Sequence, residues 1–330
     1  MTALVTGGTG FVGRAIVERL LGGGGQVKAL ARSGSSADKL SRLGAEPVRG
    51  DVLDLEAVAA AMRGCEVVYH AAGANAFCLR DSAPLFEVNV RGSENVVRAA
   101  ARAGVRRVVY TSSAATLGEA SGTIGSEESP HRGWFLSDYE RSKFEAEQAV
   151  FEAARETGIE VVSVNPASVQ GPGRATGSAR LLLDYLNGRL KAIVDSRLSL
   201  VDIADCTEGH LLAASRGTPG ERYVLSGATL TVRDGLALVA SLLGVERPLR
   251  ILPPSVAMAV ATAAETVGRL RRRSPRICRE LARTLIHGHA YDGSKATRAL
   301  GLRYTPVEET LRRTVDWWVE QRLVTGRRPS

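Results

Sequence analysis

The 330-residue chain is poor in cysteine. Its four cysteines are Cys65, Cys78, Cys206 and Cys278, and no two of them have Cys-x-x-Cys spacing. A disulfide framework of the kind found in small secreted domains needs many more cysteines in a shorter chain. We therefore expect four reduced thiols.

The sequence has no apolar run long enough to cross a bilayer and no basic, apolar leader before its first strand-like segment. These absences predict a cytoplasmic protein. The apolar stretch 254–267 is short, flanked by proline and followed by arginines. Two interpretations stay open for it: a helix packed on the core of a substrate lobe, or a helix making weak contact with a membrane surface.

The sequence also lacks aromatic residues among its basic ones. Lys and Arg number 43 against 35 Asp and Glu, and much of the excess lies in one segment. Its arginines are Arg269, Arg271, Arg272, Arg273, Arg276, Arg279 and Arg283. Without interleaved aromatics or a known reader motif, this pattern predicts a solvated face and no nucleic-acid partner.

A metal-binding cluster is missing as well. His287-Gly288-His289 supplies two imidazoles, but no further Cys, His or carboxylate clusters with them in the sequence. Zinc sites use three or four protein ligands. The sequence therefore predicts no metal.

What the chain does contain begins at its N-terminus, where an apolar run, Thr2 to Thr6, leads into Gly7, Gly10 and Gly13 and then into helix-spaced apolar residues. Gly7 permits a tight turn, Gly10 lets the backbone approach a pyrophosphate, and Gly13 lets the helix pack closely. Free amides at a helix N-terminus favour an anion. The pattern predicts a dinucleotide site that includes Thr6, Gly7, Gly10, Phe11, Val12 and Gly13.

The second strand-like run, Gln26 to Leu30, ends in Ala31-Arg32-Ser33, without the acidic residue that would bind the ribose hydroxyls of NAD. Arg32 can pair with a 2′-phosphate, and Lys39 is a second candidate cation. The sequence favours NADP(H), while NAD(H) stays open.

Strand-like and helix-like segments alternate over the first half of the chain, which predicts an α/β Rossmann-type, doubly wound parallel sheet. The strands are expected at 27–30, 46–49, 67–70, 108–111 and 160–165. We expect an NAD(P)-binding domain over 1–165 and a mainly substrate-binding lobe over 166–330, with some segments returning to the sheet. Helices are expected around 178–187, 231–243 and 254–286, and disorder only at Gly326–Ser330.

Tyr139 and Lys143 lie four residues apart in a helix-compatible run and would share one helix face. A lysine there would lower the pKa of the tyrosine and make it a usable proton donor or acceptor. Upstream, the strand-like run 107–111 ends near Ser113, where a hydroxyl could orient a reacting oxygen. The predicted catalytic residues are Ser113, Tyr139 and Lys143.

With these motifs the sequence resembles the extended short-chain dehydrogenase/reductases, also called the NAD-dependent epimerase/dehydratase family. The resemblance runs nearly end to end. Its further motifs are Gly50-Asp51-Val52, His70-Ala71-Ala72-Gly73, Asn89-Val90-Arg91-Gly92, Asn165-Pro166, Gly171-Pro172-Gly173, Leu200 to Asp205 and Tyr291 to Ala296. Within the family it is most similar to the hopanoid-associated sugar-epimerase-like and dihydroflavonol-reductase-like branch.

The resemblance implies several site residues. Asp51 and Val52 would contact adenine, Ala71 and Ala72 would line the cofactor near its ribose, and Lys143 would bind the nicotinamide ribose. The resemblance also places Gly73, Asn89, Pro166 and Val169 at the cofactor. It implies a homodimer.

Three functions stay open. Nucleotide-sugar members commonly have Arg and Tyr where this chain has Asn165 and Gln170, and often Tyr in place of Leu117. These departures favour an NADP(H)-dependent reductase of a small, fairly apolar ketone or aldehyde. The alternatives are an NAD(P)-dependent sugar epimerase or dehydratase and a non-catalytic nucleotide sensor.

Overall fold

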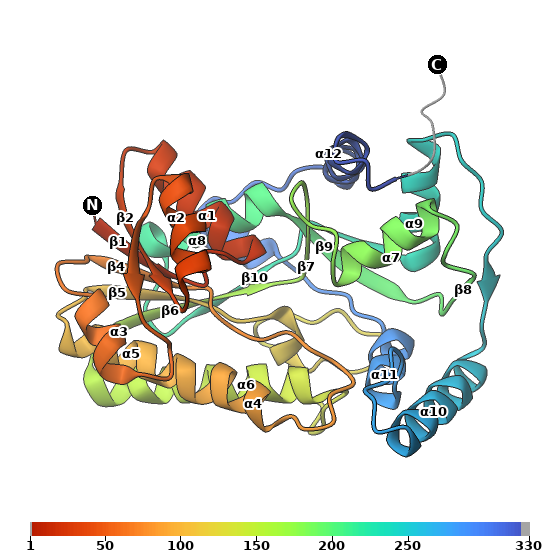
Figure 1. Ribbon diagram of the computed structural model, residues 1–330, viewed down its shortest axis with the longest axis horizontal. Coiled ribbons are helices and arrows are strands. Elements are labelled where there is room, and N and C mark those ends of the chain that lie inside the picture. The colour runs from red at the N-terminus through yellow and green to blue at the C-terminus, as the bar shows by residue number, and fades with distance from the viewer. Residues whose placement is uncertain (1, 325–330) are drawn as a thin grey trace.

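The computed structural model describes residues 2–324. The tail for which disorder is expected, Gly326–Ser330, lies outside the described residues. Figure 1 shows a sheet flanked by helices on one side of the molecule and a smaller group of helices and short strands on the other.

The main sheet has seven strands in the order β10-β6-β5-β4-β1-β2-β3, and every neighbouring pair is parallel. The strands are β1 (Thr2–Thr6), β2 (Gln26–Ala31), β3 (Glu46–Arg49), β4 (Val67–His70), β5 (Arg107–Thr111), β6 (Glu160–Pro166) and β10 (Arg222–Leu225). The predicted fold class and its strands are confirmed. The strand β10 follows residue 166 in the chain and returns to the sheet edge beside β6.

The strand order reverses beside β1. The chain runs from β1 outward through β2 to β3, then crosses back to place β4 on the other side of β1. In parallel sheets, ligands bind at the carboxyl ends of the strands where the order reverses. The segments after β1 and β4 therefore flank the expected ligand crevice.

Helices cover both faces of the sheet because alternate strand residues point to opposite faces. Val5 packs with Ile16 and Val17, whereas Leu4 packs in a second core with Val96. The helices of the first core are α1 (Phe11–Gly22), α2 (Gly34–Leu43) and α8 (Ile203–Arg216). The remaining helices are α3 (Leu55–Ala61), α4 (Ala83–Phe86), η1 (Glu87–Arg91), α5 (Gly92–Arg102), η2 (Ala114–Leu117), α6 (Asp138–Thr157) and η3 (Ala296–Leu300), of which η3 also packs in the first core.

The second group of elements surrounds a separate core that includes Leu186, Leu236 and Trp318. Its strands are β7 (Ser168–Gln170), β8 (Ala192–Ile193), β9 (Arg197–Asp202), β11 (Ala228–Thr231) and β12 (Arg250–Ile251). Its helices are α7 (Ser178–Leu186), α9 (Val232–Ser241), α10 (Pro254–Leu270), α11 (Arg279–His287) and α12 (Val307–Glu320). None of the described helices is long and apolar enough to cross a membrane.

The helical stretch expected over 254–286 is two helices. The break between α10 and α11 contains Arg272, which has a positive φ of 52°, and Pro275, which lacks an N–H group. Only Ala261 and Gly268 of α10 are buried. The helix packs on α11 and is largely exposed, so it does not match the interpretation of a core-packed helix.

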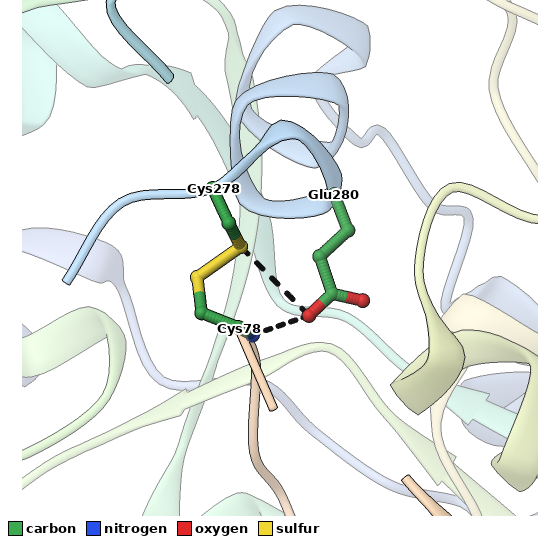
Figure 2. A group of neighbouring side chains, drawn as sticks. All are labelled: Cys78, Cys278 and Glu280. Atoms are coloured by element: carbon green, nitrogen blue, oxygen red, sulfur yellow. Dashed lines mark hydrogen bonds between the residues drawn. A yellow bond between two sulfur atoms is a disulfide. The ribbon is translucent and has the colours of Figure 1, made fainter. Parts of the chain in front are cut away.

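The expectation of four reduced thiols is wrong for two of them. Cys78 and Cys278, 200 residues apart in the sequence, form a disulfide. Figure 2 shows this bond joining the segment after β4 to the start of α11. Sequence spacing could not reveal the pair because only the fold brings the two segments together. Cys65 and Cys206 are free and buried.

Candidate functional site

The glycine turn between β1 and α1 has the close packing expected of it. Gly7 has a φ of 71°, and a Cβ there would lie 2.6 Å from the backbone nitrogen of Ala72. A Cβ on Gly13 would lie 2.3 Å from the carbonyl oxygen of Gly7. Gly10 begins α1 without a side-chain cap. The first-turn N–H groups of this helix are therefore available to an anion, as a bound pyrophosphate requires.

Thr6 holds the turn against the neighbouring strand. Its hydroxyl shares a 2.7 Å hydrogen bond with Nδ1 of His70 and accepts one of 3.2 Å from the N–H of Ala72. Phe11 and Val12 are partly buried at the start of α1. The Thr6 side chain thus joins the ends of β1 and β4.

Arg32 and Lys39 are both exposed. Arg32 directly follows β2, and Ser33 caps α2 by accepting a hydrogen bond from the N–H of Ser36. Within residues 2–324, Arg32 has no carboxylate within ion-pair distance. Its guanidinium is available to a phosphate at the carboxyl end of β2.

Asp51 and Val52 follow β3. Asp51 accepts a hydrogen bond from the N–H of Leu53, and the carbonyl of buried Val52 accepts one from the side-chain amide of Asn95. A Cβ on Gly92 would lie 2.8 Å from the Val52 side chain, so α5 approaches this loop closely. These contacts hold the loop against α5.

The segment Ala71–Gly73 continues from β4, and Asn89 braces it. The Asn89 carbonyl oxygen accepts a hydrogen bond from the N–H of Ala74, and its amide donates to the Ala74 carbonyl and to the Ser142 hydroxyl. Asn89 is fully buried. These contacts hold the segment against α6, and the place of Asn89 at the cofactor stays a prediction.

Tyr139 and Ser113 come together at the carboxyl end of β5. Ser137 caps α6 by accepting a hydrogen bond from the N–H of Glu140, which places Tyr139 in the first helical turn. Burial raises the pKa of Tyr139, whereas a hydrogen bond with Ser113 and the charge of Arg174 lower it. The two hydroxyls are therefore arranged to act on one oxygen atom.

Lys143 makes different contacts from those expected. Its ammonium donates hydrogen bonds of 2.9 Å to the Tyr110 hydroxyl and 3.0 Å to the Thr111 carbonyl. Burial lowers the pKa of Lys143 to about 8, although the charge of Glu147 opposes the shift. The charge of Arg174 lowers the pKa of Tyr139 in this structure, and the expectation that Lys143 also lowers it stays a prediction.

Sequence reasoning missed Arg174. It lies in the Gly-Pro-Gly loop after β7, donates a 2.6 Å hydrogen bond to the Val169 carbonyl and lies 5.5 Å from the centre of the Phe11 ring. Burial lowers the pKa of its guanidinium, and the nearby Tyr139 opposes that shift. No motif marks the position, because the loop brings Arg174 to Tyr139 only after folding.

The side chains at positions 165 and 170, where the resemblance implies a departure from nucleotide-sugar members of the family, are buried in the protein. Asn165 is fully buried, and its amide donates 2.6 Å and 3.0 Å hydrogen bonds to Glu147 and Thr116. Gln170 is also fully buried and donates to Ser168 and Ser178. Pro166 and Val169, predicted to lie beside nicotinamide, are buried next to them.

An aromatic side chain packs close to Tyr139. The Phe77 ring is 5.7 Å from the Tyr139 ring between centroids. Glu280, beside the disulfide in Figure 2, accepts hydrogen bonds from the N–H groups of Cys78 and Asp138. One carboxylate of α11 thus holds both the segment that carries Phe77 and the start of the helix that carries Tyr139.

A family model described as "NAD dependent epimerase/dehydratase family" matches residues 3–226. The chain belongs to this family. Sterol demethylase protein B of Methylococcus capsulatus is 34% identical, covering 98% of this chain and 100% of the relative. A Synechocystis protein named as a dihydroflavonol 4-reductase is 34% identical over 95% and 93% of the two chains. A 2-alkyl-3-oxoalkanoate reductase of Stenotrophomonas maltophilia is 31% identical over 95% and 98%.

Solved structures agree with this membership. The crystal structure of gox2253 superposes with a TM-score of 0.85 at 31% identity, covering 98% of this chain and 99% of the other. UDP-glucose 4-epimerase of Thermus thermophilus, solved in complex with NAD, has a TM-score of 0.77 at 26% identity over 97% and 99%. The resemblance drawn from the sequence is confirmed, and the protein is an NAD(P)-dependent oxidoreductase of the extended short-chain type.

Proposed function

We propose that the protein uses NADPH to reduce the carbonyl group of a small, largely apolar ketone or aldehyde, and catalyses the reverse oxidation of the alcohol. The observation that carries this proposal is the pairing of Tyr139 with Ser113, together with the burial of the side chains at positions 165 and 170. The site has groups for moving a proton at a substrate oxygen. At positions 165 and 170, however, the site has no exposed polar side chain that could bind a nucleotide sugar.

Each of the four site residues has its own role in the proposed reaction. Tyr139 donates a proton to the carbonyl oxygen during reduction, and Ser113 hydrogen-bonds the same oxygen. A bound nicotinamide supplies or accepts the hydride. Lys143 would hold the nicotinamide ribose, while Arg174 keeps the pKa of Tyr139 lower than burial alone would leave it. Holding these groups together in one crevice contributes much of the rate.

The residues that follow β2 are the reason for proposing a preference for NADPH. The exposed Arg32 follows this strand, and no acidic residue follows it before the start of α2. A guanidinium and a phosphate form strong, charge-assisted hydrogen bonds, whereas an acidic residue here would favour the ribose hydroxyls of NAD. Lys39 on α2 is the second cation within the same proposal.

The burial of Asn165 and Gln170 and the aromatic ring of Phe77 beside Tyr139 are the reasons for proposing an apolar substrate. The Stenotrophomonas relative is named for a 2-alkyl-3-oxoalkanoate, which carries a ketone and a carboxylate on an alkyl chain. Its name supports a screen that begins with alkyl and aryl ketones of increasing chain length.

The first experiment identifies the nucleotide that copurifies with the protein, by mass spectrometry before and after dialysis against NADPH. NADP(H) that exchanges freely, followed by NADPH oxidation with apolar ketones, would support the reductase. An epimerase is the second candidate, because the matching Thermus structure is a sugar epimerase with NAD. Stoichiometric NAD+ that does not wash out would favour that candidate.

Tight NADPH binding without turnover of any carbonyl tested would instead favour a non-catalytic nucleotide sensor. We propose that the enzyme works in the cytoplasm as a homodimer on a small-molecule substrate, without a nucleic-acid partner. Sedimentation of the purified chain tests the dimer.

We also propose that α10 makes weak contact with an anionic membrane surface. Val256, Val260 and Val267 are exposed on this helix, and an exposed run of arginines follows it. An apolar helix face beside cationic side chains suits a lipid interface. Flotation with anionic vesicles, but not with zwitterionic ones, is expected; equal recovery of the Val256→Asn/Val260→Asn variant would contradict the contact.

A further inference from the structure

The structure brings together three metal-ligating side chains that are far apart in the sequence. Glu119 lies just after η2, and His287 and His289 lie at and beyond the end of α11. Oε1 of Glu119 is 2.7 Å from Nδ1 of His289 and 3.5 Å from Nε2 of His287. The sequence argument against a metal relied on the absence of a third ligand, and the fold supplies it.

We propose that Glu119, His287 and His289 form a binding site for one divalent transition-metal ion of the zinc type. Two imidazole nitrogens and one carboxylate oxygen are a common ligand set for zinc, with a water molecule in the fourth position. Magnesium and calcium prefer oxygen ligands alone. The site is outside the catalytic group of Ser113, Tyr139 and Lys143.

The distances suit such an ion after a small movement. Zinc bonds of about 2.0–2.2 Å in a tetrahedron place ligand atoms roughly 3.4 Å apart. The potential ligand atoms of the three side chains already lie within 4.8 Å of one another. The 2.7 Å hydrogen bond between Glu119 and His289 would open by less than 1 Å, which rotation of the Glu119 side chain can provide.

Two buried polar atoms in this group have no hydrogen-bond partner among the described residues, namely Oε2 of Glu119 and Nε2 of His287. Buried polar atoms without partners are uncommon and require an explanation. A metal ion bound here would give both atoms a partner.

The backbone around the site is firmly held. The N–H of His289 donates to the Arg197 carbonyl in β9, and the N–H of Gly125 donates to the Ala290 carbonyl. The hydroxyl of Tyr291 lies 2.9 Å from Nδ1 of His289. The His289 side chain is 16% exposed, which leaves a path for the ion and its water. A bound ion would tie the loop after η2 to the segment after α11.

The test measures zinc binding to the full-length protein, purified without a polyhistidine tag and stripped with a chelator. Titration calorimetry and elemental analysis after dialysis should both give one zinc per chain, and magnesium should not bind. Loss of an outer-shell partner typically weakens a metal site by about 10–100-fold. Loss of a direct ligand in E119Q or H287A should weaken zinc binding at least that much.

A matched control separates this site from the other candidate group, Cys78, Cys278 and Glu280. The C78S/C278S variant should bind zinc as tightly as the parent. Zinc binding that disappears in this variant, equal affinity in E119Q and parent, or no binding by the parent would each overturn the proposal.

Cobalt provides a readout that needs no variant, in case E119Q or H287A does not fold. Co²⁺ added to the parent should give the intense visible absorption of a tetrahedral site and lose it when zinc is added. The weak spectrum of hydrated cobalt alone would overturn the proposal. Zinc should also raise the Tm of the parent and leave that of a folded E119Q variant unchanged.

Discussion

The ring of Phe77 lies 5.7 Å from that of Tyr139, at an interplanar angle of 46°. Phe77 is the residue before Cys78, which is bonded to Cys278 at the start of α11. The segment that places the Phe77 ring beside the Tyr139 ring is thus covalently attached to α11. This link connects the stability of the chain with the shape of the site.

Removing the disulfide should therefore affect both properties. The Cys278→Ser variant should lose about 2–4 kcal/mol of unfolding free energy, because the unfolded chain gains freedom, and its KM should rise because the Phe77 segment loosens. Urea denaturation and steady-state kinetics measure the two effects. Dithiothreitol should lower the unfolding free energy of the parent to that of the variant. The unfolding free energy of the variant should stay unchanged. The denatured, unreduced parent should label at two thiols, Cys65 and Cys206; labelling at four would contradict the bond.

Replacing Tyr139 with Phe should remove catalysis and spare cofactor binding. The variant keeps the ring against Phe77 and loses only the hydroxyl, so kcat should fall by about 10²–10⁴-fold. The Kd for NADPH, measured by fluorescence titration, should stay within about twofold of the parent. Full activity in Tyr139→Phe would exclude this residue from the mechanism.

Arg174 should control the pH dependence of the reaction. Its charge lowers the pKa of Tyr139, so Arg174→Leu should raise that pKa. In the oxidation direction Tyr139 must be deprotonated, and the acidic limb of the kcat/KM profile should move to higher pH. Arg174→Lys, which retains a positive charge, should move the limb less. An unchanged profile in Arg174→Leu would assign that limb to another group.

Arg32 should determine the choice of cofactor. Hydrogen bonds to charged groups contribute about 1.5–3 kcal/mol, so Arg32→Ala should weaken NADPH binding by about 10–100-fold. Binding of NADH, which lacks the 2′-phosphate, should hardly change. Lys39→Ala serves as the matched control and should have a smaller effect on NADPH. If Arg32→Ala weakens the binding of NADPH and NADH equally, Arg32 does not select the phosphate.

His210 should make the protein less stable in weak acid. Burial lowers its pKa to about 4, although a hydrogen bond with the Cys206 carbonyl opposes the shift. The unfolded chain binds a proton near pH 6.5 and the folded chain does not, so stability is complete above pH 6.5 and declines as the pH falls toward 4. At pH 5 the loss should be about 2 kcal/mol. Urea denaturation at pH 7.5 and pH 5 should show a smaller loss in His210→Asn; an equal loss would exclude His210 as the source.

The fold was largely predictable because its signals are local. Apolar runs bounded by turn residues indicated the strands from β1 to β6, and their alternation with helices predicted a parallel sheet. A return of later segments to the sheet was predicted, but Arg222–Leu225 was not identified as one of them, because its pairing with β6 joins residues far apart in the sequence. The break between α10 and α11 was also missed, although Pro275 is visible in the sequence.

Part of the candidate site could likewise be predicted from local sequence, and part could not. The sequence by itself determined the glycine turn, the Tyr139 and Lys143 spacing on one helix, and the position of Ser113 after a strand, because chain geometry fixes residues so close in sequence. Only the tertiary structure decided that Arg174 approaches Tyr139, that Lys143 contacts Tyr110, that Cys78 bonds to Cys278 and that Glu119 joins His287 and His289. These contacts join segments that the sequence keeps apart, and burial and charge act on them only after the chain has packed.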